Sequence, residues 1–198
     1  MKTVRIILWA LVAIFGAGSA WLYLSDKNSP TPQQVSDVKI GGPFELIRAD
    51  KSPITQDDIL GRPHAIFFGF TNCPEICPTT LFEASSWLKA LGTDGDKIDF
   101  YFFTVDPERD TAEVLAPYVG SFDNRITGVT GTPEKMAKVF KDYKVYVQRV
   151  DLEDDDYTMD HSASVLLFRE NGNFLGTISY GENTDTAIAK LRRLLKNG

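Results

Sequence analysis

The chain has 198 residues, of which 43% are hydrophobic and 24% are charged, and its formal net charge is −6. This length is enough for one domain with a hydrophobic core, and the composition is ordinary for a globular protein. The acidic balance argues against nucleic acid as a partner, because a phosphate backbone selects basic surfaces.

The N-terminal segment predicts a membrane anchor. Lys2 and Arg5 precede an uncharged run from Ile6 to Leu24, and a helix of that length spans about 28 Å, close to a bilayer core. The positive residues in front of the run indicate a single pass through a bacterial inner membrane, with the remaining chain in the periplasm. A cleaved signal peptide is the alternative, because residues 16–20 are small, but the length of the run favours a retained anchor.

A linker follows the anchor. Pro30 and Pro32 interrupt a mostly polar stretch without hydrophobic periodicity, which is typical of an extended connection. We therefore expect an anchor over residues 1–25, a linker over 26–38 and one folded domain over 39–198.

Strands and helices alternate along this domain. The segments His64–Phe70 and Ile98–Val105 are continuous apolar runs, typical of strands buried on both faces. Further strands are predicted at Phe44–Arg48, Val145–Val150, Val165–Phe168 and Phe174–Tyr180. Helices are predicted at Thr79–Leu91, Thr111–Val119, Pro133–Tyr143 and Thr184–Lys196. This order predicts an α/β protein with a mixed sheet flanked by helices, for which a thioredoxin-like fold is the natural candidate.

The two cysteines of the chain, Cys73 and Cys77, directly follow the first buried strand. α/β folds place their sites at this carboxyl end of a strand. Pro78 suits the first turn of a helix, so we expect Cys77 near the positive end of a helix dipole, with a lowered pKa. The alternatives are inert buried thiols or a structural disulfide, although so short a loop gains little from cross-linking.

The spacing of the cysteines favours a metal over a purely redox role. Three residues separate them, whereas thioredoxin-type redox motifs have two. The wider loop lets both sulfurs point at one ion, and two thiolates select copper(I) or zinc over hard ions. A closed zinc site needs four ligands, and the chain offers two cysteines and two histidines in total.

His161 is the better of the two histidine candidates. His64 opens the strand at the end opposite Cys73, some 20 Å away, so a structural role is expected for it. His161 stands directly before the strand at Val165–Phe168, where thioredoxins carry a proline loop that packs against the cysteine pair. That pattern puts Ala163 at the place of the proline and His161 beside the sulfurs. Two thiolates and one imidazole suit copper(I), and copper(II) with an added weak ligand.

Three features near His161 are candidates for supporting roles. Met159 is a candidate weak ligand, with a core or loop position as the alternative. Asp160 is a candidate for orienting His161 or adding charge near the ion, with a solvent-facing carboxylate as the alternative. The acidic run Glu153–Asp156 predicts a mobile loop, from which we hypothesise that His161 becomes ordered on metal binding.

The segment from Asp106 to Thr111 predicts a turn from a strand into a helix. Pro107 restricts the turn, and Asp110 or Thr111 is expected to cap the helix that follows. Docking of a partner is the alternative role for this segment.

In these residues the sequence resembles the Sco/SenC family, copper chaperones for cytochrome c oxidase assembly. The similarity extends from Gly41 to the last helix, and its most specific block is Phe68–Leu81. The segments Val105–Thr111 and Asp156–Ser162 are also similar. The chain departs from the family pattern at Asn72, where a histidine is common, and at Ala112, where a proline is common; neither position is a candidate ligand.

The resemblance implies a thioredoxin fold and a copper ion held by Cys73, Cys77 and His161, with Asp160 as an outer-sphere partner. It also implies a periplasmic copper donor, and delivery of copper to the binuclear copper site of cytochrome c oxidase subunit II. The alternative function is a thiol–disulfide oxidoreductase that reduces the cysteines of that site, with Cys73 as the attacking thiolate. A thiol peroxidase is a third interpretation, but no motif assigns the activating arginine that it needs.

Overall fold

The computed structural model describes residues 39–153 and 156–196, together with nine single positions before residue 22. The predicted anchor and linker therefore lie largely outside the described residues. Within the described part of the chain, no helix combines the length and the apolar character needed to cross a membrane. Residues Lys39–Gly198 form one compact unit.

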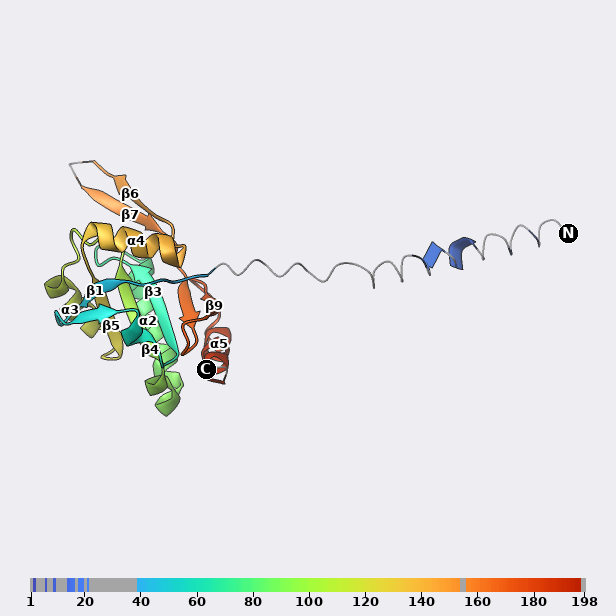
Figure 1. Cartoon of the computed structure of the whole chain (residues 1–198), viewed down its shortest axis with the longest axis horizontal. Coiled ribbons are helices and arrows are strands. Elements are labelled where there is room, and N and C mark those ends of the chain that lie inside the picture. The colour runs from blue at the N-terminus through green and yellow to red at the C-terminus, as the bar shows by residue number, and fades with distance from the viewer. Residues whose placement is uncertain are drawn as a thin grey trace. The chain divides into compact units, whose positions relative to one another are not determined.

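A seven-stranded mixed sheet runs through this unit in the order β2-β1-β5-β4-β3-β8-β9 (Figure 1). Its strands are β1 (Glu45–Arg48), β2 (Pro53–Thr55), β3 (His64–Gly69), β4 (Asp99–Thr104), β5 (Ile126–Thr130), β8 (Val165–Phe168) and β9 (Phe174–Ile178). The three central strands β3, β4 and β5 are parallel, and β1 and β8 flank them in antiparallel pairing. β3 is buried along its whole length, as expected for a parallel strand covered on both faces.

Helices cover both faces of the sheet. They are α2 (Ile76–Ala90), α3 (Ala112–Gly120), α4 (Pro133–Tyr143) and α5 (Thr184–Lys196), with short 3₁₀ turns η1 (Asp57–Ile59) and η2 (Gly92–Lys97). Tyr143 of α4 packs against Phe103 with ring centroids 6.3 Å apart, whereas Tyr118 of α3 packs against Phe102 at 5.7 Å. Since neighbouring side chains of a strand point to opposite faces, the aromatic run of β4 contributes to the core on both sides of the sheet.

A separate two-stranded sheet carries the late histidine. β6 (Val147–Asp151) and β7 (Tyr157–His161) pair with each other in antiparallel register, with Val147 opposite His161. This hairpin lies beside α4 (Figure 1), and residues of both elements line one pocket of about 300 Å³.

The prediction of a mixed sheet flanked by helices is confirmed, and α4 and α5 have the predicted bounds. α2 begins at Ile76, three residues before the predicted start, so that Cys77 and Pro78 lie in its first turn. β2, β5 and β7 were not predicted. β5 has a glycine at its centre, and β7 is mostly polar, so neither shows the apolar pattern by which a strand is found.

Candidate metal centre

The two cysteines lie where β3 ends and α2 begins. Both are free thiols; Cys73 is half-buried in the turn, and Cys77 is fully buried at the second position of α2. A Cβ atom added to Gly69 would stand 2.9 Å from the sulfur of Cys77 and 2.7 Å from the ring of Phe102. Glycine is therefore required at the end of β3 for the sulfur to approach the strand so closely.

The N-terminus of α2 is directed at the sulfur of Cys73. No side chain caps this helix at Glu75, but the backbone N–H of Cys77 donates to Cys73 Sγ at 3.4 Å. The pKa of Cys73 falls to about 5, first because the Cys77 thiol donates a hydrogen bond to it, and then because backbone N–H groups of Cys77, Glu75 and Ile76 face it; partial burial opposes the shift. The Cys73 thiolate thus serves as the capping acceptor of the helix.

The prediction that Cys77 has a lowered pKa is wrong. Its pKa is raised well above the ordinary value, first because it donates to the Cys73 sulfur and second because burial penalises its charged form. A helix dipole stabilises an anion that stands in front of the N–H groups, and that position belongs to Cys73. At neutral pH the pair therefore consists of a Cys73 thiolate and a Cys77 thiol.

β7 brings His161 to this pair from 84 residues further along the chain. Its Nε2 lies 3.7 Å from Cys77 Sγ, and its Nδ1 lies 3.0 Å from the carbonyl oxygen of Ser162. A carbonyl can only accept, so Nδ1 carries a proton, and in the neutral ring the lone pair of Nε2 faces the sulfur. The ring packs edge-on against Phe70, with centroids 5.9 Å apart and an interplanar angle of 85°.

The spacing of these two donor atoms fits a shared metal ion. Bonds of about 2.3 Å to sulfur and about 2.05 Å to nitrogen, at angles of about 110–120°, separate the donors by about 3.6–3.8 Å. The observed distance of 3.7 Å from Cys77 Sγ to His161 Nε2 lies within this range. In residues 39–153 and 156–196, however, no three histidine, cysteine or acidic side chains are already gathered as a metal-binding group.

A pocket of about 270 Å³ opens beside these residues. Its lining consists of the cysteine turn and the end of the hairpin: Phe70, Cys73, Pro74, Glu75, Ile76, Thr158, Met159, Asp160, His161 and Ala163. Asp160 is exposed at this pocket, whereas Met159 is partly buried and packs against the core. The structure therefore brings Cys73, Cys77 and His161 together, with Asp160 and Ala163 beside them.

His64 lies at the other end of β3 and takes no part in this site. It is buried, its ring stacks on Phe168 with centroids 5.2 Å apart, and its Nδ1 lies 3.0 Å from the carbonyl oxygen of Arg62. Burial lowers its pKa, which favours the neutral ring. The expected structural role of His64 is confirmed.

Of the two residues predicted to cap α3, Thr111 stands at the N-cap position, although its side chain makes no capping hydrogen bond, and Asp110 does not cap the helix. The buried carboxylate of Asp110 instead accepts bonds from the backbone N–H of Thr71 at 3.0 Å, from Thr71 Oγ1 at 2.5 Å and from Thr104 Oγ1 at 2.6 Å. Burial raises the pKa of Asp110, against the effect of these bonds. Asp110 therefore holds the turn that leads into Cys73, a contact over 39 residues that local motifs do not reveal.

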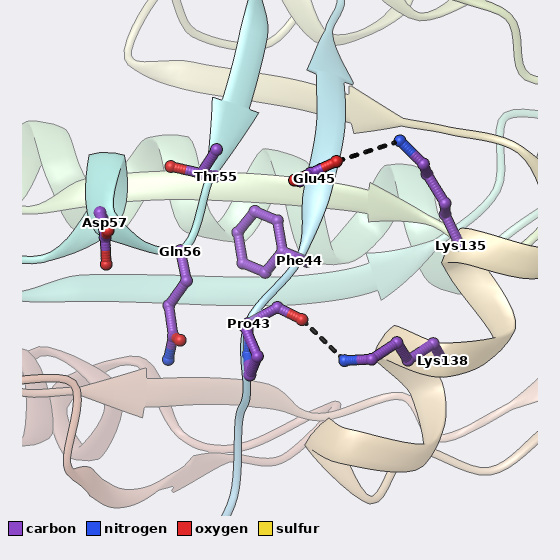
Figure 2. A pocket seen from close by; sticks show the side chains of 8 residues that line it. All are labelled: Pro43, Phe44, Glu45, Thr55, Gln56, Asp57, Lys135 and Lys138. Atoms are coloured by element: carbon purple, nitrogen blue, oxygen red, sulfur yellow. Dashed lines mark hydrogen bonds and ion pairs between the residues drawn. The ribbon is translucent and has the colours of Figure 1, made fainter.

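A larger hollow of about 480 Å³ lies between β1 and α4 (Figure 2). It is lined by Pro43, Phe44, Glu45, Thr55, Gln56, Asp57, Lys135 and Lys138. Figure 2 shows that both lysines are engaged: Lys135 Nζ lies 3.7 Å from Glu45 Oε2, and Lys138 Nζ donates to the carbonyl of Pro43 at 2.8 Å. We regard this hollow as a structural junction between the start of the domain and α4.

The sheet order, the dithiol at the start of a helix and the histidine that faces it define a thioredoxin-like dithiol protein. The family model for SCO1/SenC matches residues 32–196. The chain therefore belongs to the SCO1/SenC family, as its motifs predicted.

Relatives of known name agree with this assignment. The mitochondrial SCO1 homolog 1 of Arabidopsis thaliana is 37% identical over 92% of this chain and 60% of its own length, and an SCO2-like protein of Rickettsia prowazekii is 36% identical over 86% of each chain. This chain thus spans about three fifths of the Arabidopsis protein. The solved structure of Bradyrhizobium japonicum ScoI with copper bound is 42% identical, with a TM-score of 0.74 over 78% of this chain and 99% of that one. The predicted thioredoxin-like fold is confirmed.

Cys73 is predicted to be the reactive thiol. Its thiolate is the nucleophile, so labelling with iodoacetamide, read by mass spectrometry, should rise with pH around a midpoint near its pKa of about 5. Cys77 should react far more slowly, because it is fully buried and protonated. The Cys73→Ser variant should lose the labelling at low pH. A midpoint near about 8.5, the ordinary thiol value, would contradict the assignment.

Proposed function

We propose that this protein is a copper metallochaperone that binds one copper ion through Cys73, Cys77 and His161. In this proposal it delivers the ion to the binuclear copper site of cytochrome c oxidase subunit II. The observation that carries the proposal is the 3.7 Å approach of His161 Nε2 to Cys77 Sγ. Relatives solved with copper bound support it, and Sco proteins are described as cytochrome c oxidase assembly proteins.

The unequal cysteines suit a protein that must both take up and release its cargo. Cys73 offers a thiolate at neutral pH, whereas Cys77 must lose a proton before it binds, so loading releases about one proton. The raised pKa of Cys77 makes return of that proton favourable, which assists release of the ion to an acceptor. Transfer then proceeds by exchange of one ligand at a time.

The ligand set also matches the two oxidation states of copper. Two thiolates and an imidazole form a trigonal set for copper(I), and an added water or weak ligand completes copper(II). Asp160 is proposed as the outer-sphere partner, since it is exposed at the pocket that contains His161. Its contribution is charge near the ion, because the Nδ1 of His161 already faces the carbonyl of Ser162.

A thiol–disulfide oxidoreductase is the second candidate, and the low pKa of Cys73 favours it. The Cys73 thiolate would attack a partner disulfide and release one partner thiolate; Cys77 would then close the Cys73–Cys77 disulfide and release the second. Two electrons pass to the partner. The second step needs Cys77 as a thiolate, which its raised pKa opposes. This chemistry also assigns no role to His161, so we place it second.

The proposed location is the periplasmic face of the inner membrane, with copper supplied by a periplasmic donor. Residues 1–25 serve as anchor and residues 26–38 as linker to the domain at 39–198. The support is the uncharged run from Ile6 to Leu24 behind two positive residues. The full chain should remain with the membrane pellet after alkaline carbonate extraction, and a variant without residues 2–25 should be soluble. A soluble mature chain that begins near residue 20 would contradict a retained anchor.

Substitution of the three proposed ligands tests the copper site. Cys73→Ser and Cys77→Ser should each abolish tight copper(I) binding, measured by competition with a chromophoric chelator. Loss of an outer-sphere partner alone typically lowers metal affinity by about 10- to 100-fold, so His161→Ala should weaken copper(I) binding at least as much. His161→Ala should also abolish copper(II) binding and its thiolate charge-transfer band.

His64→Asn is the matched control, because His64 is the other histidine and lies at the opposite end of β3; this variant should bind copper as the parent does. A protein whose dithiol only exchanged disulfides would be unaffected by His161→Ala. Unchanged stoichiometry and affinity in that variant would overturn the proposed site.

A further inference from the structure

The hairpin that carries His161 is attached to the rest of the domain by side chains. In the described part of the chain, β6 and β7 pair only with each other and not with the seven-stranded sheet. At the His161 end, the bonds between Tyr146 and Ser162 stay within the hairpin segment. The position of His161 therefore depends on the contacts of its own ring with Cys77 and Phe70 and on contacts at other points of the hairpin.

Those contacts converge on Tyr157, at the opposite end of β7. Its ring lies between two guanidinium groups, with the Cζ atoms of Arg109 and Arg149 at 3.5 and 3.6 Å from its centroid. Its hydroxyl donates to Asp106 Oδ1 at 2.8 Å, and its carbonyl accepts from Arg109 Nη2 at 2.6 Å. The other oxygen of the buried Asp106 carboxylate, Oδ2, accepts a hydrogen bond from Arg109 Nε at 2.6 Å. We call Asp106, Arg109 and Tyr157 the hairpin clamp.

The remaining ion pairs of the hairpin segment with the rest of the domain also involve the turn at residues 106–109. Arg109 Nη1 pairs with Asp156 at 3.1 Å, and Arg149 Nη1 pairs with Glu108 at 3.4 Å. Apart from the contact of His161 with Cys77, the hydrogen bonds and ion pairs that join residues 146–153 and 156–162 to the rest of the described chain all end on residues 106–109. The turn after β4 is thus the polar attachment of the hairpin.

The same turn also holds the cysteines. Asp110 accepts two bonds from Thr71, two residues before Cys73, and one from Thr104. Thr104 in turn accepts from the backbone N–H of Asp106 at 2.9 Å. A single segment, residues 104–110, therefore bonds to the cysteine turn on one side and to the hairpin on the other.

β7 connects the clamp residue Tyr157 to His161. Tyr157, Met159 and His161 alternate along the strand and share one face, and Met159 packs against the core between them. Four residues of strand place His161 about 13 Å from Tyr157. A small change in the orientation of the hairpin at the clamp therefore displaces the imidazole of His161 relative to the sulfurs. A displacement of this kind is enough to misplace a metal ligand.

We propose that Arg109 and Tyr157 are positioning residues for copper binding, which hold His161 at bonding distance from the dithiol through the rigid attachment of the hairpin. This inference rests on the proposed function. It also predicts that the loop end of the hairpin, at Tyr157, is held with or without copper, so that any ordering of His161 on metal binding is confined to the last residues of β7.

A double-mutant cycle on the full chain tests the proposal. Arg109→Lys retains the charge but loses the planar group that contacts Tyr157, Asp106 and Asp156 at once. Its copper(I) affinity, measured by chelator competition, should fall about 10-fold. In the His161→Ala background the same substitution should change affinity less than about 2-fold, because its effect acts through His161. Tyr157→Phe, which retains the ring and loses the bond to Asp106, should give a smaller loss with the same dependence on His161.

Two control variants remove comparable groups outside the clamp. Tyr146→Phe loses a hydroxyl bonded to Gln148 within the hairpin segment, and Arg62→Lys alters an arginine paired with Asp99 at the far end of the sheet. Both should bind copper as the parent does. Equal losses for Arg109→Lys with and without His161 would show a general structural role and overturn the inference, with the copper site intact. If His161→Ala itself left binding unchanged, the proposed function and the inference would both fail.

Discussion

The approach of the His161 ring to the Cys77 sulfur is the contact on which the proposed copper site depends. The two residues belong to elements that share no backbone pairing, since α2 follows the central β3 and β7 lies in a separate two-stranded sheet. The segment at residues 104–110 joins them: Asp110 bonds to the turn before Cys73, and Arg109 bonds to the hairpin. In the proposal made above, one short turn determines the relative position of two side chains that are 84 residues apart.

The dithiol combines two opposed environments within one helical turn. The hydrogen bond from the Cys77 thiol, and then the N–H groups at the start of α2, lower the pKa of Cys73, while that hydrogen bond and burial against Gly69 raise the pKa of Cys77. A pair of equally stabilised thiolates would hold copper(I) more tightly, because no proton would compete for either sulfur. The observed asymmetry is instead suited to a carrier. The Cys73 thiolate would bind the ion first, and return of a proton to Cys77 would favour its release.

The sequence predicted those parts of the structure that depend on local pattern. The apolar runs of β3 and β4, the bounds of α4 and α5, and the gathering of Cys73, Cys77 and His161 at one place follow from periodicity and from the position of motifs at strand ends. The separate hairpin and the roles of Asp110 and Arg109 did not follow, because they depend on side-chain bonds across 39 to 51 residues. The lowered pKa predicted for Cys77 was wrong, because position in a helix does not reveal which sulfur the N–H groups face.

X-ray absorption of the full chain loaded with copper(I) tests the central claim most directly, because it counts the atoms bound to the ion. The account predicts two sulfur ligands and one nitrogen, with the outer scattering of an imidazole ring that disappears in His161→Ala. A copper ion bound by sulfur alone, with a spectrum that His161→Ala leaves unchanged, would contradict it.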